Sequence, residues 1–264
     1  MIDLHSHILP DLDDGARDWN ESIEMCRIAA AGGTHIIVAT PHQADGTYNT
    51  ENAQITSAVA ELQRRVHENG LALQILPGGD VRVESISREA GWKERVMTLA
   101  DNGRYMLVEL PEFMSPRLFQ HVLDGVKQEG ITPILTHPER SVNVQLYPHC
   151  LVPLVAHGSL IQVTADSFTG TFGPRAAQCA VDLLRRRLIH IVASDAHSAV
   201  RRPPGLLRSR EAVTELAGPA EASRIFDETP EYVLQGAPVD VPPPVVGKLP
   251  FLRRLLRRIL GRPG

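Results

Sequence analysis

Two histidines separated by one residue stand near the start of the chain, at His5 and His7. Alternate residues of a β-strand point to the same side, so both imidazoles could reach one metal ion from a strand. Such a pair alone is weak evidence, because a single histidine is more often a hydrogen-bonded structural residue. The stronger signal is that further imidazoles and carboxylates close other apolar runs in the same way. These are His42, Asp80, Glu109, His137, Asp195 and His197.

The loop after His7 adds the acids Asp11, Asp13 and Asp14 before Gly15. We assign Asp11 to an acidic turn in which Gly15 supplies a positive φ. Because the loop leaves the His-x-His segment directly, we expect either Asp13 or Asp14 to be a metal ligand. Carboxylates and imidazoles without thiolates suit manganese, magnesium, iron or zinc. The ligands outnumber the needs of one ion, so we expect two or three ions.

The elements that must position these residues are short apolar runs rich in β-branched side chains, at 1–5, 34–39, 73–79, 105–110, 131–136, 159–164 and 188–194. Helical spacing occurs between them, notably at 20–31, 50–69, 116–128, 174–187 and 207–217. This alternation predicts buried parallel strands, in either an open sheet or a barrel. Ligands at the ends of many different strands favour the barrel. The sequence has neither a glycine-rich dinucleotide fingerprint nor a Gly-Lys-Ser/Thr phosphate loop.

The three cysteines, Cys26, Cys150 and Cys179, lie far apart in apolar helical contexts and are expected to be small hydrophobic residues. Cys179 and Arg185 have the Cys-x5-Arg spacing, but they fall within the helical pattern at 174–187 and not in a phosphate-binding loop, which argues against a cysteine-dependent phosphatase. The chain starts without the pattern of a secretory signal and has no stretch of ~18 apolar residues. We therefore expect one cytoplasmic catalytic domain at 1–236, followed by a tail.

The net charge of −4 conceals an asymmetry. Six of the 27 basic residues lie among the last 17 residues, which contain no acid. The other 21 stand against 31 acids, so residues 1–247 carry about −10, which argues against binding to nucleic acid.

The tail divides into two parts. Prolines predict an extended linker at 237–250, and residues 251–264 have the spacing of a basic amphipathic helix. This helix could dock on the barrel or pack against a partner. It could also lie on an anionic membrane and hold the protein at its inner face.

The motifs together resemble the polymerase-and-histidinol-phosphatase (PHP) superfamily of metal-dependent phosphoesterases. Within it, the sequence is most similar to the bacterial capsule and exopolysaccharide protein-tyrosine phosphatases, which act on bacterial tyrosine kinases. The shared segments cover about residues 1–235 and are Met-Ile-Asp-Leu-His-Ser-His-Ile, Asp-Asp-Gly, Ala-Thr-Pro-His, Leu-Val-Glu-Leu, Thr-His-Pro-Glu-Arg, Ala-Ser-Asp-Ala-His and Arg-Pro-Pro. The resemblance implies a distorted (β/α)7 TIM-like barrel and a three-metal centre, with manganese as the first choice of ion.

The resemblance also implies roles for individual residues. One ion would bind His5, His7, Asp80 and Asp195; a second would share Asp80 and add Glu109 and His137; a third would bind Asp14, His42 and His197. The bridging position, usually glutamate in the family, is Asp80 here. Arg140 and Arg202 would bind phosphoryl oxygens through their planar donor groups.

The expected reaction is in-line attack of a metal-bridging hydroxide on phosphotyrosine of a bacterial tyrosine kinase. A small-molecule phosphatase such as histidinol-phosphate phosphatase is an alternative, although that branch typically has histidine in place of Asp13-Asp14. A nuclease or proofreading module is a second alternative, which the acidic body disfavours. A metal-dependent amide hydrolase would need a carboxylated lysine on a strand, and no strand here offers a suitable lysine.

Overall fold

The computed structural model describes residues 1–44, 46–83, 86, 91–111 and 116–247. Its strands are β1 (Ile2–Ser6), β2 (Ile36–Ala39), β3 (His42–Gln43), β4 (Gln74–Pro77), β5 (Asp80–Arg82), β6 (Tyr105–Glu109), β7 (Thr132–Thr136), β8 (Leu160–Thr164) and β9 (Ile191–Ala193). The α-helices are α1 (Trp19–Ala31), α2 (Asn52–Glu68), α4 (Pro116–Gln128), α5 (Val142–Leu146), α6 (Val152–Ala156), α7 (Gly173–Arg185), α8 (Leu207–Ala217), α9 (Pro219–Ser223) and α10 (Thr229–Leu234). Short 3-10 turns lie at η1 (Trp92–Glu94), η2 (Leu99–Asp101), η3 (Pro138–Arg140), η4 (Pro148–Leu151) and η5 (Ala165–Ser167), and a π-turn at η6 (Arg224–Glu228).

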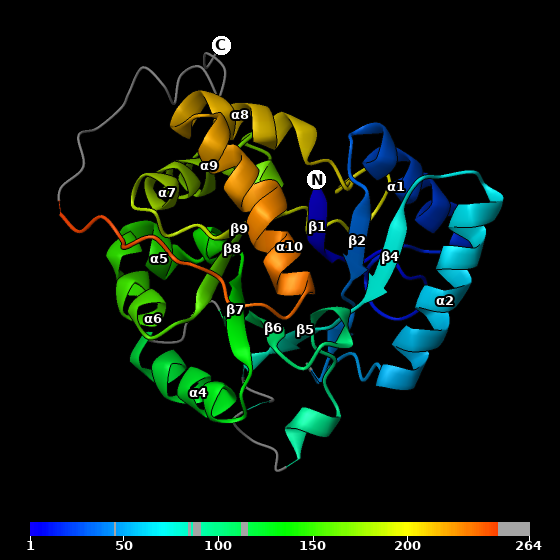
Figure 1. Cartoon of the computed structure of the whole chain (residues 1–264), viewed down its shortest axis with the longest axis horizontal. Helices are drawn as coiled ribbons and strands as arrows, with labels where there is room; N and C mark the ends of the chain where they lie inside the picture. Colours follow the sequence, from blue (N-terminus) through cyan, green and yellow to red (C-terminus); the bar gives the residue numbers. More distant parts are fainter. Residues whose placement is uncertain (45, 84–85, 87–90, 112–115, 248–264) are drawn as a thin grey trace.

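The predicted alternation of parallel strands and helices is confirmed, and each predicted apolar run contains strand. All strand pairs are parallel, in the orders β1-β2-β4 and β3-β5-β6-β7-β8-β9. Helices flank the strands, and α10 crosses in front of them in the view of Figure 1. Apolar side chains from β1, β2 and β6 to β9 form an inner core, of which Leu4, Leu107 and Ile134 are fully buried members. The fold is therefore a TIM-like barrel with a filled interior.

The barrel is distorted because the second and third strand runs are each broken. Pro41 lies in the break between β2 and β3, where proline cannot donate to a strand ladder. Gly78 and Gly79 separate β4 from β5, and a Cβ on Gly79 would lie 2.1 Å from the side-chain oxygen of Gln43. Beyond both breaks the chains pair again, with His42 opposite Asp80. The breaks thus place His42 and Asp80 side by side at the carboxyl ends of the strands.

The first and last strands meet without a continuous ladder. An isolated bridge joins Ser6 to Ala196, and the backbone N–H groups of Asp195 and His7 donate to the carbonyls of His5 and Ala196, both at 2.8 Å. These bonds lie at the carboxyl ends of β1 and β9, where the predicted ligands are concentrated. The first and last strands are therefore tied together at the end that carries the site.

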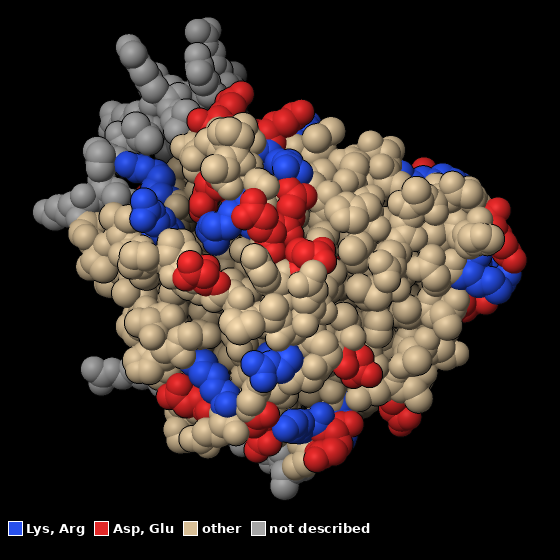
Figure 2. Space-filling view, viewed as in Figure 1, with Lys and Arg blue, Asp and Glu red and all other residues tan. Residues whose placement is uncertain are grey.

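The chain beyond α10 follows the surface of the barrel. The Tyr105 hydroxyl donates to the carbonyl of Ala237 at 2.5 Å, and the N–H of Val245 donates to the carbonyl of Arg186 at 2.8 Å. The predicted helix at 251–264 lies outside the described residues. Across the described ranges, no helix is both long enough and apolar enough to cross a membrane. On the face drawn in Figure 2, acidic and basic side chains are interspersed.

Candidate metal centre

Imidazole rings from four parts of the chain meet at the carboxyl ends of the strands. The His7 ring centroid lies 3.9 Å from that of His197 and 4.6 Å from that of His42. The His5 ring lies 5.2 Å from His7 and 5.9 Å from His137. The carboxylates of Asp14, Asp80, Glu109 and Asp195 lie within 4 Å of these rings. The structure thus brings together every residue predicted as a ligand.

The donor atoms form three overlapping groups in which an ion could be held. The groups are His7, Asp14, His42 and His197; His5, His7 and Asp80; and His42, Asp80 and Glu109. His7, His42 and Asp80 each belong to two groups. The division of ligands among ions that the family resemblance implies therefore stays a prediction, since these three residues reach more than one position.

The hydrogen bonds around His5 and His7 fit a bound cation. Nδ1 of His5 lies 3.0 Å from Oε1 of Gln162, and Nδ1 of His7 lies 2.6 Å from Oδ2 of Asp13. Oxygen acceptors favour a proton on each Nδ1, which leaves lone pairs on the two Nε2 atoms. Those Nε2 atoms face each other at 3.1 Å. A divalent cation would satisfy both Nε2 atoms, which in its absence could share only a single proton between them.

Buried polar atoms without hydrogen-bond partners also indicate a bound cation. Among the described residues, both carboxylate oxygens of Asp80 and Nδ1 of His42 are buried without a hydrogen-bond partner. Buried polar atoms in folded proteins nearly always have partners, so a cluster of exceptions suggests an ion. Although aspartate is shorter than the glutamate usual at this position, Oδ2 of Asp80 lies 3.7 Å from Nε2 of His5 and 3.5 Å from Nδ1 of His42. It therefore reaches imidazoles on both sides, as a bridging ligand must.

The two neighbouring acids of the first loop have different surroundings. Asp13 is buried, and its carboxylate accepts from His7, from the backbone N–H of His42 at 2.9 Å and from that of Gly15 at 2.9 Å. The side chain of Asp14 is 52% exposed and lies 3.7 Å from His42 and 3.6 Å from His197. Asp14 is thus the acid that faces the site, and Asp13 orients His7.

Burial and neighbouring charges have opposing effects on several pKa values in this cluster. Burial lowers the pKa of His5 to about 3, which keeps its ring neutral. Burial would also lower the pKa of His7, but the Asp13 carboxylate raises it to about 9. Burial and the nearby Glu109 raise the pKa of Asp80 well above its usual range. Burial disfavours the charge on Asp195, yet His5 and Arg140 hold its pKa well below the usual range.

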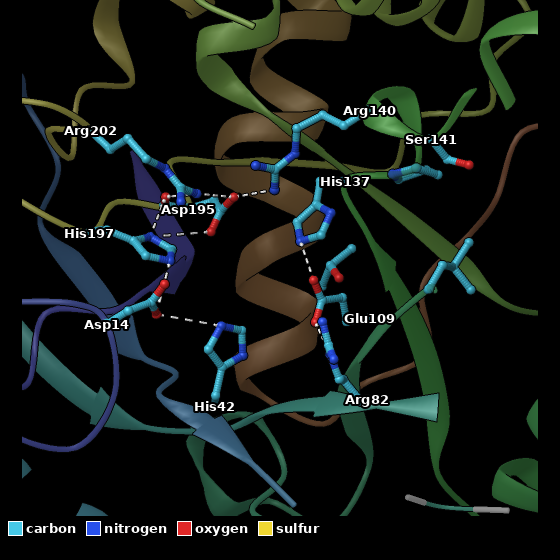
Figure 3. Close-up of a pocket in the computed structure, with 13 residues that line it drawn as sticks. Asp14, His42, Arg82, Glu109, His137, Arg140, Ser141, Asp195, His197 and Arg202 are labelled. Carbon is cyan, nitrogen blue, oxygen red and sulfur yellow. Dashed lines mark hydrogen bonds and ion pairs between the residues drawn. The ribbon is translucent and has the colours of Figure 1, made fainter. Parts of the chain in front are cut away.

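Both predicted arginines lie beside this cluster. Nη2 of Arg140 and Nη2 of Arg202 contact the same carboxylate oxygen of Asp195, the second at 2.6 Å (Figure 3). They line a pocket of about 330 Å³ together with Asp14, His42, Arg82, Glu109, Leu110, Thr136, His137, Pro138, Ser141, Asp195 and His197. A phosphoryl group in this pocket would have metal ligands on one side and guanidinium groups on another.

Two of the site residues have left-handed backbone conformations. His137 has φ 35° and Asp195 has φ 52°. Non-glycine residues rarely adopt positive φ, at a cost of about 1–3 kcal/mol each, and such residues cluster at functional sites. His137 directly precedes η3, so its conformation turns the chain sharply between a ligand and Arg140.

Sequence reasoning missed several residues that support the site. Gln162 on β8 holds His5, and Tyr48 stacks on His42 with ring centroids 5.8 Å apart. The expectation that Gly15 supplies a positive φ is wrong, because Asp11 has that conformation, with φ 62°. Gly15 is needed for space, since a Cβ there would lie 2.1 Å from the carbonyl oxygen of His7. A buried amide on a predicted strand was the available signal for Gln162.

A parallel barrel that gathers imidazoles and carboxylates at the carboxyl ends of its strands is an architecture of metal-dependent hydrolases. The family model for capsular polysaccharide synthesis, CpsB/CapC, matches residues 1–235. The chain therefore belongs to the CpsB/CapC family, which confirms the resemblance stated from the motifs.

Individual relatives cover nearly the whole chain. The tyrosine-protein phosphatase YwqE of Bacillus subtilis (strain 168) is 34% identical over 246 residues, which is 92% of this chain and 95% of YwqE. The tyrosine-protein phosphatase CpsB of Streptococcus pneumoniae is 28% identical, over 89% of this chain and 98% of CpsB. A crystal structure from work on YwqE and CpsB as unique metal-dependent tyrosine phosphatases matches with a TM-score of 0.86 and 33% identity, covering 94% of this chain and all of that one.

Proposed function

We propose that this chain is a metal-dependent protein-tyrosine phosphatase that acts on phosphotyrosine of a bacterial tyrosine kinase in capsule or exopolysaccharide synthesis. The observation that carries the proposal is the convergence of metal-binding side chains and two arginines on one pocket, in a member of the CpsB/CapC family. The identity of 34% with a protein named a tyrosine-protein phosphatase supports the choice of substrate.

The proposed ligands are His5, His7, Asp14, His42, Asp80, Glu109, His137, Asp195 and His197. Two or three divalent ions, with manganese as the first choice and magnesium, iron or zinc as alternatives, would neutralise the phosphate dianion and lower the pKa of a water molecule. Asp13 and Gln162 would keep His7 and His5 in the tautomers that offer Nε2 to an ion.

Arg140 and Arg202 would orient the phosphoryl group. Both guanidinium groups lie at the pocket wall, and each uses one Nη2 on Asp195, which leaves other N–H groups for phosphoryl oxygens. Hydrolysis forms a bond from a water oxygen to phosphorus and breaks the bond from phosphorus to the tyrosine oxygen. The departing phenolate, with a pKa near ~10, takes up a proton to give tyrosine and inorganic phosphate.

The tail would place the enzyme beside its substrate. The basic amphipathic helix predicted from the sequence at 251–264 would suit the anionic inner face of a membrane, where a membrane-bound kinase would be within reach. We therefore propose a cytoplasmic protein at the membrane surface, with the kinase as its protein partner.

The test compares hydrolysis of a phosphotyrosine peptide, histidinol phosphate and single-stranded DNA by the full chain with each candidate metal. We expect kcat/KM to be highest for the phosphotyrosine peptide. A preference for histidinol phosphate would reassign the chain to small-molecule phosphatases, and a preference for DNA would reassign it to nucleases.

A further inference from the structure

Phe172 contacts both arginines of the pocket. Its ring centroid lies 4.7 Å from Cζ of Arg140 and 5.8 Å from Cζ of Arg202. Both distances are within the ~6 Å range in which a guanidinium is attracted to an aromatic face. Phe172 directly precedes α7 and is partly buried, and it does not line the pocket. Its ring therefore contacts the guanidinium groups from outside the space available to a ligand.

The other contacts of the two arginines leave their positions poorly fixed. Both use Nη2 on one carboxylate oxygen of Asp195, and Nη2 of Arg202 also donates to the backbone carbonyl of Asp195 at 2.8 Å. Nε of each arginine is buried without a hydrogen-bond partner in the described part of the chain. The second oxygen of Asp195 lies 3.5 Å from Nε2 of His5, where an ion would compete for the carboxylate. The Asp195 carboxylate alone is thus a poor anchor for the arginines.

An aromatic face is suited to holding the two guanidinium groups in place for two reasons. It accepts no conventional hydrogen bond from the guanidinium groups, so their N–H donors stay available to phosphoryl oxygens. The negative potential on the ring face also offsets part of the repulsion between the guanidinium groups of Arg140 and Arg202, which share one wall of the pocket. Neither effect depends on whether Asp195 is engaged by an ion.

We propose that Phe172 is a positioning residue that holds Arg140 and Arg202 together as one phosphate-binding unit. The proposal rests on the proposed role of the two arginines in binding phosphate. The proposal predicts that the aromatic face of Phe172, and not only its apolar volume, is needed to hold the two arginines. Phe168 offers a contrast, because it lies in the same connection between β8 and α7 and is fully buried in the hydrophobic core.

The experiment uses Phe172→Leu, Phe172→Tyr and the matched control Phe168→Leu in the full chain loaded with manganese. The first readout is the dissociation constant of inorganic phosphate, measured by calorimetry, which requires no turnover. The second is the separation of KM from kcat for a phosphotyrosine peptide. Thermal unfolding of each variant reports its stability.

We expect Phe172→Leu to weaken phosphate binding about tenfold, since two cation–π contacts are lost, and to raise KM by a similar factor. Phe172→Tyr should stay close to the wild type because it keeps the aromatic face. Phe168→Leu should lower the unfolding temperature and leave phosphate binding unchanged. In Arg140→Gln, adding Phe172→Leu should weaken phosphate binding less than it does in the wild type, because one of its two partners is already gone.

Unchanged phosphate binding in Phe172→Leu would overturn the proposal, as would a Phe172→Tyr variant as weak as Phe172→Leu. A wild-type protein that binds no phosphate would overturn it too. If the wild type binds phosphate but does not hydrolyse phosphotyrosine, the proposed function fails while the effect of Phe172 on phosphate affinity still decides this inference.

Discussion

Asp13 and Asp14 are adjacent in the chain but contact different parts of the site. The sequence could place an acid from this loop over the barrel mouth, but the choice between the two depends on the path of the loop. That path is set by Gly15, which lies against the backbone of His7 and lets the N–H of Ala16 donate to the His7 carbonyl at 3.1 Å. Asp13 then points inward to His7, and Asp14 points to the open pocket.

Substituting each acid separately should give different metal-binding defects. We expect Asp14→Asn to reduce the number of bound ions, because a proposed ligand is lost. Asp13→Asn should keep the number of ions and weaken their affinity about 10–100-fold, which is typical when the partner of a ligating histidine is removed. Manganese titration followed by elemental analysis measures both quantities.

Asp11→Asn is the matched control in the same loop. Asp11 is exposed and has positive φ, a conformation that asparagine also tolerates, so metal binding should match that of the wild type. A loss of stoichiometry in Asp13→Asn but not in Asp14→Asn would reverse the assignment of the two acids.

At the scale of elements, Asp3 joins the first strand to the last. Its Oδ1 accepts from the backbone N–H of Ser194 at 2.9 Å, and the Ser194 hydroxyl donates to the carbonyl of His5 at 3.3 Å. Asp3 is fully buried on β1 and was not singled out from the sequence. Burial raises its pKa to about 6, although the hydrogen bonds from Ser194 act in the other direction. We therefore expect the joint between β1 and β9 to weaken as the pH rises through about 6.

The pKa of Asp3 predicts a difference in stability between the wild type and Asp3→Asn that changes with pH. Because the folded-state pKa is raised, Asp3 stabilises the fold most below its unfolded pKa, and this contribution is lost as pH rises through about 6. Relative to Asp3→Asn, the wild type should lose on the order of 1 kcal/mol of unfolding free energy between about pH 5 and about pH 8. Urea unfolding of the metal-free proteins measures this.

Asp240→Asn is the control for that comparison, since Asp240 is exposed. Its stability difference from the wild type should be nearly the same at both pH values. A difference for Asp3→Asn that is equally constant would show that the buried carboxyl does not titrate with folding.

The strands and long helices were predictable because buried parallel strands form continuous apolar runs between helical patterns, and the ligands follow from the polar residues that end those runs. The breaks around Pro41 and Gly78 were not predictable, because only three-dimensional contacts show that they bring His42 opposite Asp80. The left-handed conformations of His137 and Asp195 have no local signal, since neither is glycine. The division of ligands among ions does not follow from sequence spacing, because His7, His42 and Asp80 each belong to two groups of donor atoms.

In the whole molecule, the basic tail follows an acidic body to which the preceding chain is bound. The acidic residues lie in the body, and the described chain is held against the barrel as far as Val245. Whatever the basic tail binds is therefore tethered a short distance from the body that carries the pocket. This arrangement suits an enzyme whose substrate is fixed at a surface.

Co-sedimentation with vesicles tests the predicted membrane anchor. We expect the full chain to bind vesicles that contain anionic lipid, to bind less at high salt and to bind neutral vesicles weakly. A chain ending at residue 246 should lose this binding, since the basic residues of the tail are removed. Equal binding by the two chains would rule out the anchor and leave docking on the barrel or on a partner.

Hydrolysis of phosphotyrosine by this chain should depend on metal held by the imidazole and carboxylate cluster. The most direct measurement is the turnover of a phosphotyrosine peptide by the full chain after stripping with a strong chelator, and again after manganese is added back. We expect activity to be lost in chelator and restored by manganese, while Asp14→Asn should recover only in part. Full activity in the stripped protein would contradict this expectation.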